Sequence, residues 1–174
     1  TAFTISSTSL NGWISGVDPV TVDFEGTSDF DVTVTVPHVA AGIMDAWSVS
    51  VVAANDDTVD NSVSGNVIVD TVTGHTLTGD TDLSGNPGDT VTYHFTILNT
   101  GNAQEKMDYT VSSSWAVSTP GGSTTLGMGA FDTISVTQTI PANAAAGASA
   151  SVTFNVVNGD GSSAVVTTTA NQEY

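Results

Sequence analysis

Apolar and polar residues alternate with a period of two along much of the chain. The alternation runs through residues 20–24, 30–36, 47–51, 91–97 and 152–156. Each run predicts a half-buried strand with Thr, Ser, Asp or Asn on the wet face. No long segment carries apolar residues at helical spacing. We therefore predict an all-β chain of short antiparallel strands packed as β-sandwiches.

Clusters of Gly, Asn, Asp and Pro separate the predicted strands, and such clusters are typical of turns. They occupy residues 55–61, 79–89, 99–102, 120–123 and 158–162. The Ala-rich stretch 142–150 follows Pro141 and is interrupted by Gly147, so we interpret it as a loop.

The chain repeats itself. Trp13 and Trp115 lie 102 positions apart, and Pro37 and Pro141 lie 104 positions apart, each within a similar order of predicted strands and turns. The second copy has two predicted strands, around 75–83 and 91–98, in front of Tyr109. The first copy begins only two residues before Phe3. These observations predict two tandem modules, an incomplete one over 1–73 and a complete one over 74–174.

The missing strands predict an open groove in the first module. We expect an apolar lining that a donated strand fills by β-augmentation, unless the chain is a fragment of a larger protein. We expect the donor to be the C-terminal tail, 167–174, or an N-terminal segment of an adjacent subunit. The residues expected to line the groove are Phe3, Ile5, Trp13, Phe30, Val32 and Val34.

Charge narrows the range of partners. The 174 residues include 18 acidic side chains against one Lys and no Arg, giving a formal net charge of -17. Nucleic acids and anionic membranes are excluded as ordinary partners, because binding phosphate requires a positive surface. The longest apolar runs are a few residues, which predicts no membrane insertion. The absence of Cys excludes disulfides, thiol catalysis and Cys-based zinc sites.

Two acidic clusters are candidate Ca²⁺ sites. Alternating oxygen-bearing side chains followed by Gly85 resemble the first half of a calcium loop, although the twelfth position is Val91 and not an acid. The second cluster lies at a predicted hairpin tip in the first module. A solvated polar turn is the alternative at both places. The candidate ligands are Asp80, Asp82, Ser84 and Asp89 in the loop, and Asp56, Asp57 and Asp60 at the tip.

No catalytic constellation emerges. His38, His75 and His94 belong to no spaced metal motif and to no Ser–His–Asp arrangement. The acidic residues lie in turns, without a recognisable pair for glycoside hydrolysis. Trp13 and Trp115 occupy equivalent repeat positions, which favours a packing role over stacking on sugars. We therefore predict that the protein is not an enzyme and requires no cofactor, with Ca²⁺ as the one candidate ligand.

One segment resembles a known family. Residues 80–102, with Gly-Asp-Thr-Val-Thr-Tyr at 88–93 and Asn-Thr-Gly-Asn at 99–102, are similar to Ig-like repeats of bacterial and archaeal cell-surface proteins, which are related to α-galactosidase-associated Ig-like domains. The resemblance implies Ig-like β-sandwiches with a scaffold or assembly role. Within this segment Pro87-Gly88 predicts the turn that starts a strand. Residues 99–102 end that strand with residues that tolerate positive φ.

Together these features predict an extracellular, cell-surface structural subunit. We expect it to assemble with copies of itself into a filament or surface layer by strand sharing, with cell-surface or glycan contact left open. A saline or cation-rich medium would favour assembly at this charge. The alternative is a spacer or carbohydrate-binding module from a larger secreted hydrolase or adhesin.

Overall fold

The computed structural model describes residues 1–157 and 161–171. It is built of β-strands, and the all-β prediction is confirmed. No helix able to span a membrane occurs among the residues it describes. The chain divides into two compact units, Thr1–Thr71 and Val72–Tyr174, called unit 1 and unit 2 below. The division falls two residues before the predicted boundary between 73 and 74.

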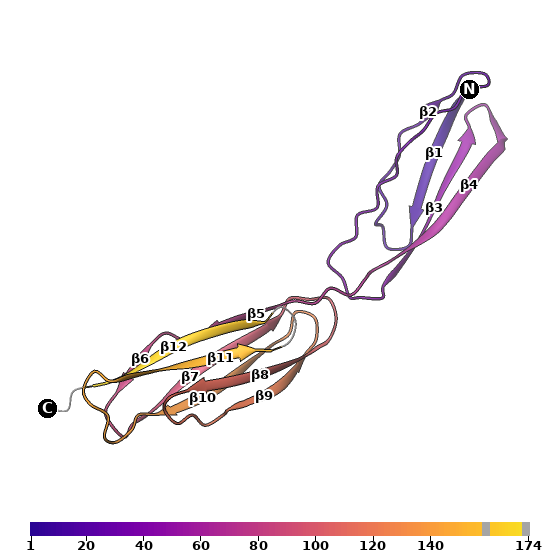
Figure 1. Cartoon of the computed structure of the whole chain (residues 1–174). Coiled ribbons are helices and arrows are strands. Elements are labelled where there is room, and N and C mark those ends of the chain that lie inside the picture. The colour runs from indigo at the N-terminus through magenta and orange to yellow at the C-terminus, as the bar shows by residue number, and fades with distance from the viewer. Residues whose placement is uncertain (158–160, 172–174) are drawn as a thin grey trace. The chain divides into compact units, whose positions relative to one another are not determined.

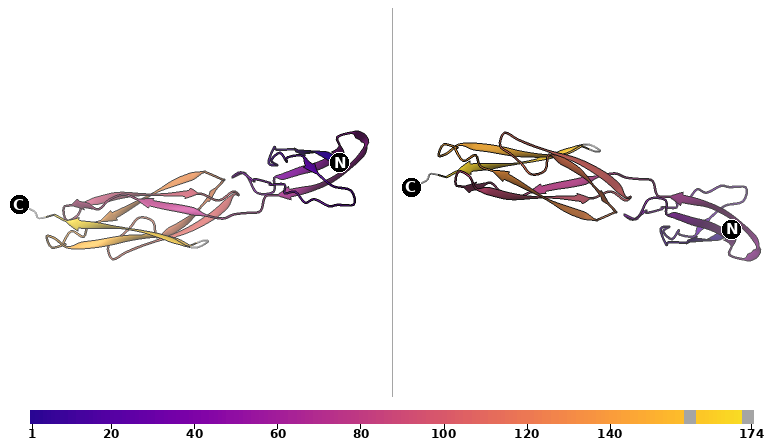
Figure 2. Two further views of the ribbon diagram at one scale, coloured as in Figure 1. Left: turned by 90° about the horizontal axis from the view of Figure 1, so that it is seen from above. Right: turned by 90° about the horizontal axis from the view of Figure 1, so that it is seen from below.

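Unit 2 is a sandwich of two sheets (Figures 1 and 2). The three-stranded sheet has the order β10 (Phe131–Thr139), β7 (Thr90–Asn99), β5 (His75–Gly79). The five-stranded sheet has the order β6 (Leu83–Gly85), β12 (Ser162–Ala170), β11 (Ser149–Val156), β8 (Glu105–Ser113), β9 (Gly121–Leu126). All pairs are antiparallel except β6 with β12.

Strand β7 supplies the centre of the unit 2 core. Its alternation places Tyr93, Phe95 and Ile97 on one face, and all three are fully buried. The Phe95 ring stacks on Phe154 of β11 at 4.6 Å between centroids, which joins the two sheets. Each such side chain stabilises the fold by about 1.5–3 kcal/mol through burial.

A buried polar chain crosses the same core. Thr168 Oγ1 donates its proton to Gln138 Oε1, so it accepts the hydrogen bond from the Tyr93 hydroxyl at 2.7 Å. Gln138 Nε2 in turn donates to Ser113 Oγ at 2.6 Å. Because every member has a partner, the fully buried side chains of Tyr93, Gln138 and Thr168 leave no polar atom unsatisfied, and the half-buried Ser113 ends the chain of bonds.

The segment from 86 to 102 shapes both ends of β7. The Pro87-Gly88 turn is closed by Asp89 N donating to Asn86 O at 3.0 Å. At the other end Asn99 is fully buried, and its Nδ2 donates to the carbonyls of Ala103 and Leu126. The expected positive φ is absent from residues 99–102. Gly101 is needed because a Cβ there would lie 2.5 Å from the carbonyl oxygen of Val72.

Unit 1 contains one antiparallel sheet. Its order is β2 (Val20–Thr21), β1 (Ala2–Ser9), β3 (Met44–Ala53), β4 (Asp56–Ile68). Residues between β1 and β3 carry little regular structure beyond β2 and an isolated bridge between Ile14 and Val34. Within residues 1–71, all of which are described, the buried apolar side chains are Ile5, Trp13, Val49 and Ala53.

Three sequence predictions about unit 1 were wrong in detail. The strand predicted over 20–24 is only two residues long, and the strand predicted over 30–36 is reduced to the bridge at Val34. The turn predicted over 55–61 is almost entirely strand, because β4 begins at Asp56 and pairs with β3. The expected C-terminal donor was also misplaced, since 167–170 belong to β12; residues 172–174 lie outside the described residues.

Candidate functional site

Each unit contains an isolated β-bridge, and the hydrogen bonds around the two bridges follow the same pattern. In unit 1, Ser15 N donates to Thr33 O at 3.0 Å and Thr35 N donates to Trp13 O at 2.8 Å. In unit 2, Ser118 N donates to Thr137 O and Thr139 N donates to Ala116 O, both at 2.9 Å. The bridges are Ile14 with Val34 and Val117 with Gln138. Segment 30–36 of unit 1 is therefore equivalent to 134–140, which includes most of β10.

A second pattern of hydrogen bonds occurs in both units and shows that β3 is equivalent to β11 and β4 to β12. Gly42 N donates to Val69 O, and Val69 N donates to Ile43 O, each at 2.9 Å. Gly147 and Ala170 make the same reciprocal bonds, since Gly147 N donates to Ala170 O and Ala170 N donates to Ala148 O. Counting along the strands from these backbone bonds, Val49 corresponds to Phe154, Val63 to Ala164 and Val67 to Thr168.

Unit 1 has no counterpart of β7. In unit 2, β10 pairs with β7 over its whole length, from Phe131 opposite Leu98 to Thr139 opposite Thr90. Thr33 and Thr35 direct their backbone groups toward Trp13 and Ser15, so the neighbouring residues direct theirs to the opposite side. Among the described residues, no partner bonds the backbone N–H or C=O of Phe30, Val32 or Val34.

An apolar groove lies where β7 would be. It has a volume of about 170 Å³. Its lining consists of Ile14, Phe30, Val32, Val34, Trp47, Val49 and Val63. Val49 and Val63 correspond to residues that lie close to Phe95 in unit 2. Phe154 stacks on Phe95, and both Phe95 and Ala164 lie next to Gly79.

The structure brings together half of the residues predicted for the groove. Phe30, Val32 and Val34 line it and are half-buried. Ile5 and Trp13 are buried in unit 1 and do not line the groove, and Phe3 is half-buried on β1, opposite Ala53. The prediction missed Ile14, Trp47, Val49 and Val63. The alternation of residues 47–51 marked Trp47 and Val49 as inward-facing, so that signal was available.

Gly65 fixes how Trp47 lies in the groove. The two residues are directly opposite each other on β3 and β4. A Cβ on Gly65 would lie 2.6 Å from Cζ2 of the Trp47 ring. The indole therefore occupies the space beside Gly65 that a side chain would fill, a position that is open only while residue 65 has no side chain.

A fully buried carboxylate holds the turn that follows β1. Asp45 Oδ1 accepts from Asn11 N at 2.7 Å, and Asp45 Oδ2 accepts from Ser9 Oγ. Ser9 Oγ accepts from Trp13 N at 2.8 Å, and in unit 2 Ser113 Oγ accepts from Trp115 N. The spacing is four residues in unit 1 and two in unit 2, and the isolated bridges align Trp13 with Ala116. The equivalence of Trp13 and Trp115 predicted from the repeat is therefore displaced by one position, because the two turns differ in length.

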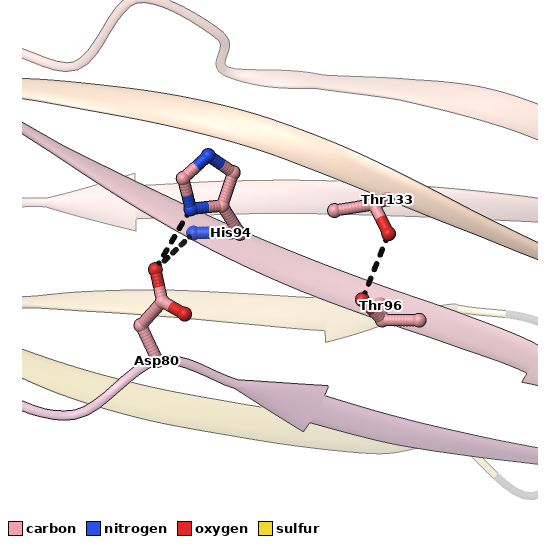
Figure 3. A network of polar contacts seen from close by, with 4 residues as sticks. All are labelled: Asp80, His94, Thr96 and Thr133. Carbon is pink, nitrogen blue, oxygen red and sulfur yellow. Dashed lines mark hydrogen bonds and ion pairs between the residues drawn. The ribbon is translucent and has the colours of Figure 1, made fainter.

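The carboxylates in the first set of predicted calcium ligands each accept hydrogen bonds from a different residue. Asp80 Oδ2 accepts from His94 N at 2.8 Å and lies 3.0 Å from His94 Nδ1 (Figure 3). Asp82 Oδ1 accepts from Thr167 N at 2.7 Å, and Asp89 Oδ2 accepts from Asn86 N at 2.8 Å. Ser84 is on β6, opposite Thr169. Each carboxylate fixes a different part of unit 2.

The second acidic cluster lies at the start of β4, where every residue is exposed. Hydrogen bonds from the hydroxyl and the backbone N–H of Thr58, at 2.6 and 3.1 Å, hold the pKa of Asp56 below its ordinary value. Asp57 and Asp60 are exposed on the same strand. In the described part of the chain no group of three or more His, Asp or Glu could hold a metal ion. Calcium binding stays a prediction.

Comparisons with known proteins found similarity among solved structures. No family model matches the chain, and no curated protein matches it. Among solved structures, domains 4 and 5 of the S-layer protein SbsC match at 18% identity with a TM-score of 0.38, covering 97% of this chain and 70% of that one. Domains 1–6 of surface layer protein SbsC match at 18% identity with a TM-score of 0.40, covering 98% of this chain and 20% of that one. Both structures come from a surface-layer protein.

Proposed function

We propose that the chain is a non-enzymatic, extracellular structural subunit of two Ig-like modules, and that a strand from a neighbouring subunit completes unit 1. The observation that carries the proposal is the groove in unit 1, which occupies the place of β7 and is lined by apolar side chains. Filling such a groove with a strand is recognition by β-augmentation, in which backbone hydrogen bonds give affinity and side-chain pockets give specificity.

Burial favours a filled groove. In unit 2 the equivalent place holds three fully buried side chains of β7. In unit 1 the half-buried lining and the 59% exposed Val63 leave apolar surface in contact with water. A donated strand removes that surface from water and also pairs the free backbone groups of segment 30–36, and both effects stabilise the complex.

The test compares assembly of the full chain with that of two charge variants. Val32→Asp places a carboxylate in the groove, whereas Thr33→Asp places the same charge on the exposed face of the same segment. We expect the wild type and Thr33→Asp to form filaments or sheets by negative-stain electron microscopy. We expect Val32→Asp to sediment as a monomer.

Circular dichroism of each variant verifies that the strands remain folded. A wild-type chain that stays monomeric at every salt and calcium concentration would overturn the assembly proposal. So would assembly of Val32→Asp at the same concentration as the wild type, because the groove would then be irrelevant to the contact.

A further inference from the structure

We propose that the groove of unit 1 accepts a single antiparallel strand with the alternation of β7, but with a purely apolar side chain where β7 has Tyr93. The proposal rests on the proposed function and specifies the direction, register and side-chain chemistry of the donated strand. Each of these follows from comparing unit 1 with the completed unit 2.

Register comes from the pairing of β10 with β7. Ile134 lies opposite Phe95, Val136 opposite Tyr93 and Gln138 opposite Val91. Their equivalents in unit 1 are Phe30, Val32 and Val34. The donated strand therefore runs antiparallel to 30–36 and places three inward side chains, two residues apart, opposite these positions. The side chain opposite Phe30 enters the groove beside Val49 and Val63, whose equivalents Phe154 and Ala164 lie close to Phe95 in unit 2.

The hydrogen-bonded side chains in the core of unit 2 indicate which side chain the donated strand carries at its middle inward position, opposite Val32. Tyr93 is satisfied there because its hydroxyl donates to Thr168, which in turn bonds Gln138. In unit 1 these two positions are Val67 and Val34. A Tyr opposite Val32 would bury its hydroxyl without a partner, which carries a substantial penalty. The groove therefore selects Phe, Leu, Ile or Val over Tyr at this position.

The outward face of the donated strand is selected by charge. Thr133 and Ser135 lie opposite Thr96 and His94 on the exposed face of unit 2, where Thr96 and Thr133 share a hydrogen bond of 2.9 Å (Figure 3). The equivalents of Thr133 and Ser135 in unit 1 are Asp29 and Asp31, both exposed. Like charges directly opposite each other are destabilising, so the donor carries neutral or basic residues here.

In the proposed function the donor is a segment of a neighbouring subunit. Each of the twelve strands in the described residues already pairs within its own unit, so the donated segment is none of these twelve strands. A donor of the required chemistry is an extended segment of about seven residues with three alternating apolar side chains and no acid between them.

The binding test uses a fluorescein-labelled peptide with the sequence of residues 88–100, in its own form and with Tyr93→Phe, added to the full chain. We expect the Phe peptide to bind about fivefold or more tightly than the Tyr peptide, measured by fluorescence anisotropy. A peptide with both His94→Asp and Tyr93→Phe should bind more weakly than the Phe peptide. Chain variant Val32→Asp should bind none of them, while Thr33→Asp should retain binding.

Disulfide mapping tests direction and register. The chain has no Cys, so one engineered Cys in the chain and one in the peptide have a unique partner. Asp31 and the peptide's residue 94 form a non-hydrogen-bonded pair in the proposed register, with Cα atoms about 4.5 Å apart, which a disulfide accommodates. We expect Asp31→Cys to cross-link to the peptide with His94→Cys, and Thr35→Cys to remain unlinked.

The outcomes separate this proposal from the proposed function. Tight binding of the Phe peptide with the Asp31 cross-link supports the proposal even if the chain never polymerises, in which case the assembly role fails alone. If the chain assembles in a Val32-dependent manner but no peptide binds, or cross-linking favours Thr35, the proposal for the donor is overturned while the structural role stands. Equal affinity for the Tyr and Phe peptides would overturn the selection at the middle position.

Discussion

At the scale of single residues, Gly65 determines where the side chain of Trp47 lies in unit 1. Trp47 lines the groove only because Gly65 leaves the space that the indole occupies, with 2.6 Å between a hypothetical Cβ and Cζ2. At the equivalent pair in unit 2, a Val is paired with a Val, Val152 opposite Val166. Trp47 thus depends on a contact that a single methyl group would disturb.

We predict that Gly65→Ala destabilises unit 1 by about 1–3 kcal/mol, because the added methyl group overpacks against the Trp47 ring. Urea unfolding followed by Trp fluorescence measures the change. The matched control is Gly16→Ala, since a Cβ on Gly16 meets nothing within 4 Å. An unchanged midpoint for Gly65→Ala would show that Trp47 moves aside at no cost.

Asp45 illustrates a residue whose role sequence could not reveal. It lies in an acidic chain, and nothing in its neighbours distinguishes it from exposed carboxylates such as Asp31. Its burial arises because the turn after β1 folds back onto β3 and brings Ser9 and Asn11 to it from more than thirty positions away. Only the pairing of β1 with β3 makes this contact visible.

At the scale of elements, segment 30–36 alternates between inward and outward side chains although it does not form a strand. Its burial alternates as the sequence predicts, with Phe30, Val32 and Val34 inward and Asp31 and Thr33 outward. Yet it is no strand, because a strand is defined by pairing and this segment has only a single bridge partner. Its counterpart β10 has a similar pattern and is a full strand, since β7 lies beside it.

We predict that amide hydrogen exchange distinguishes the two segments. The amides of Phe30, Val32 and Val34 should exchange within seconds to minutes, whereas those of Ile134, Val136 and Gln138 should be protected by orders of magnitude, because only the latter group is paired with β7. NMR-detected exchange of the monomeric chain measures this. Equal protection in the two sets would mean that the groove is already filled.

The sequence therefore predicted the elements whose partners are present and failed where partners are missing or distant. Residues 91–97 were predicted correctly as the inward-facing strand of unit 2, because their alternation is uninterrupted. Asp56 was assigned to a turn because Asn and Asp favour turns, whereas pairing with β3 overrides that preference. For the groove, three of the seven lining residues were predicted from the repeat. Of the other four, Ile14 belongs to the isolated bridge, and Trp47, Val49 and Val63 lie on β3 and β4. Their approach to segment 30–36 depends on the packing of segments distant in sequence, which alternation alone does not specify.

At the scale of the whole molecule, the charge opposes the contact that the groove favours. Lys106 is the only Lys or Arg of the chain, and it lies in unit 2, so unit 1 has acidic residues without any such basic side chain. Copies approaching one another therefore repel. The repulsion acts over the Debye length, which is ~30 Å at 0.01 M salt and ~8 Å at 0.15 M.

We predict that self-association strengthens as monovalent salt rises from about 0.01 to 0.15 M, because screening removes the repulsion and leaves the apolar contact intact. Analytical ultracentrifugation of the full chain at several salt concentrations measures the dissociation constant. Weaker association at higher salt would indicate a contact made by attractive ion pairs.

The polar chain of Tyr93, Thr168, Gln138 and Ser113 has a further consequence for how copies of this protein meet during folding. Two modules that share part of their architecture in one polypeptide invite domain swapping, in which β7 of one molecule inserts into unit 1 of another. The hydroxyl of Tyr93 has a hydrogen-bond acceptor only in unit 2, because the groove of unit 1 has Val67 at the position of Thr168. A single buried oxygen atom therefore disfavours insertion of β7 into unit 1 of another molecule. The groove of unit 1 then stays open for the donated strand.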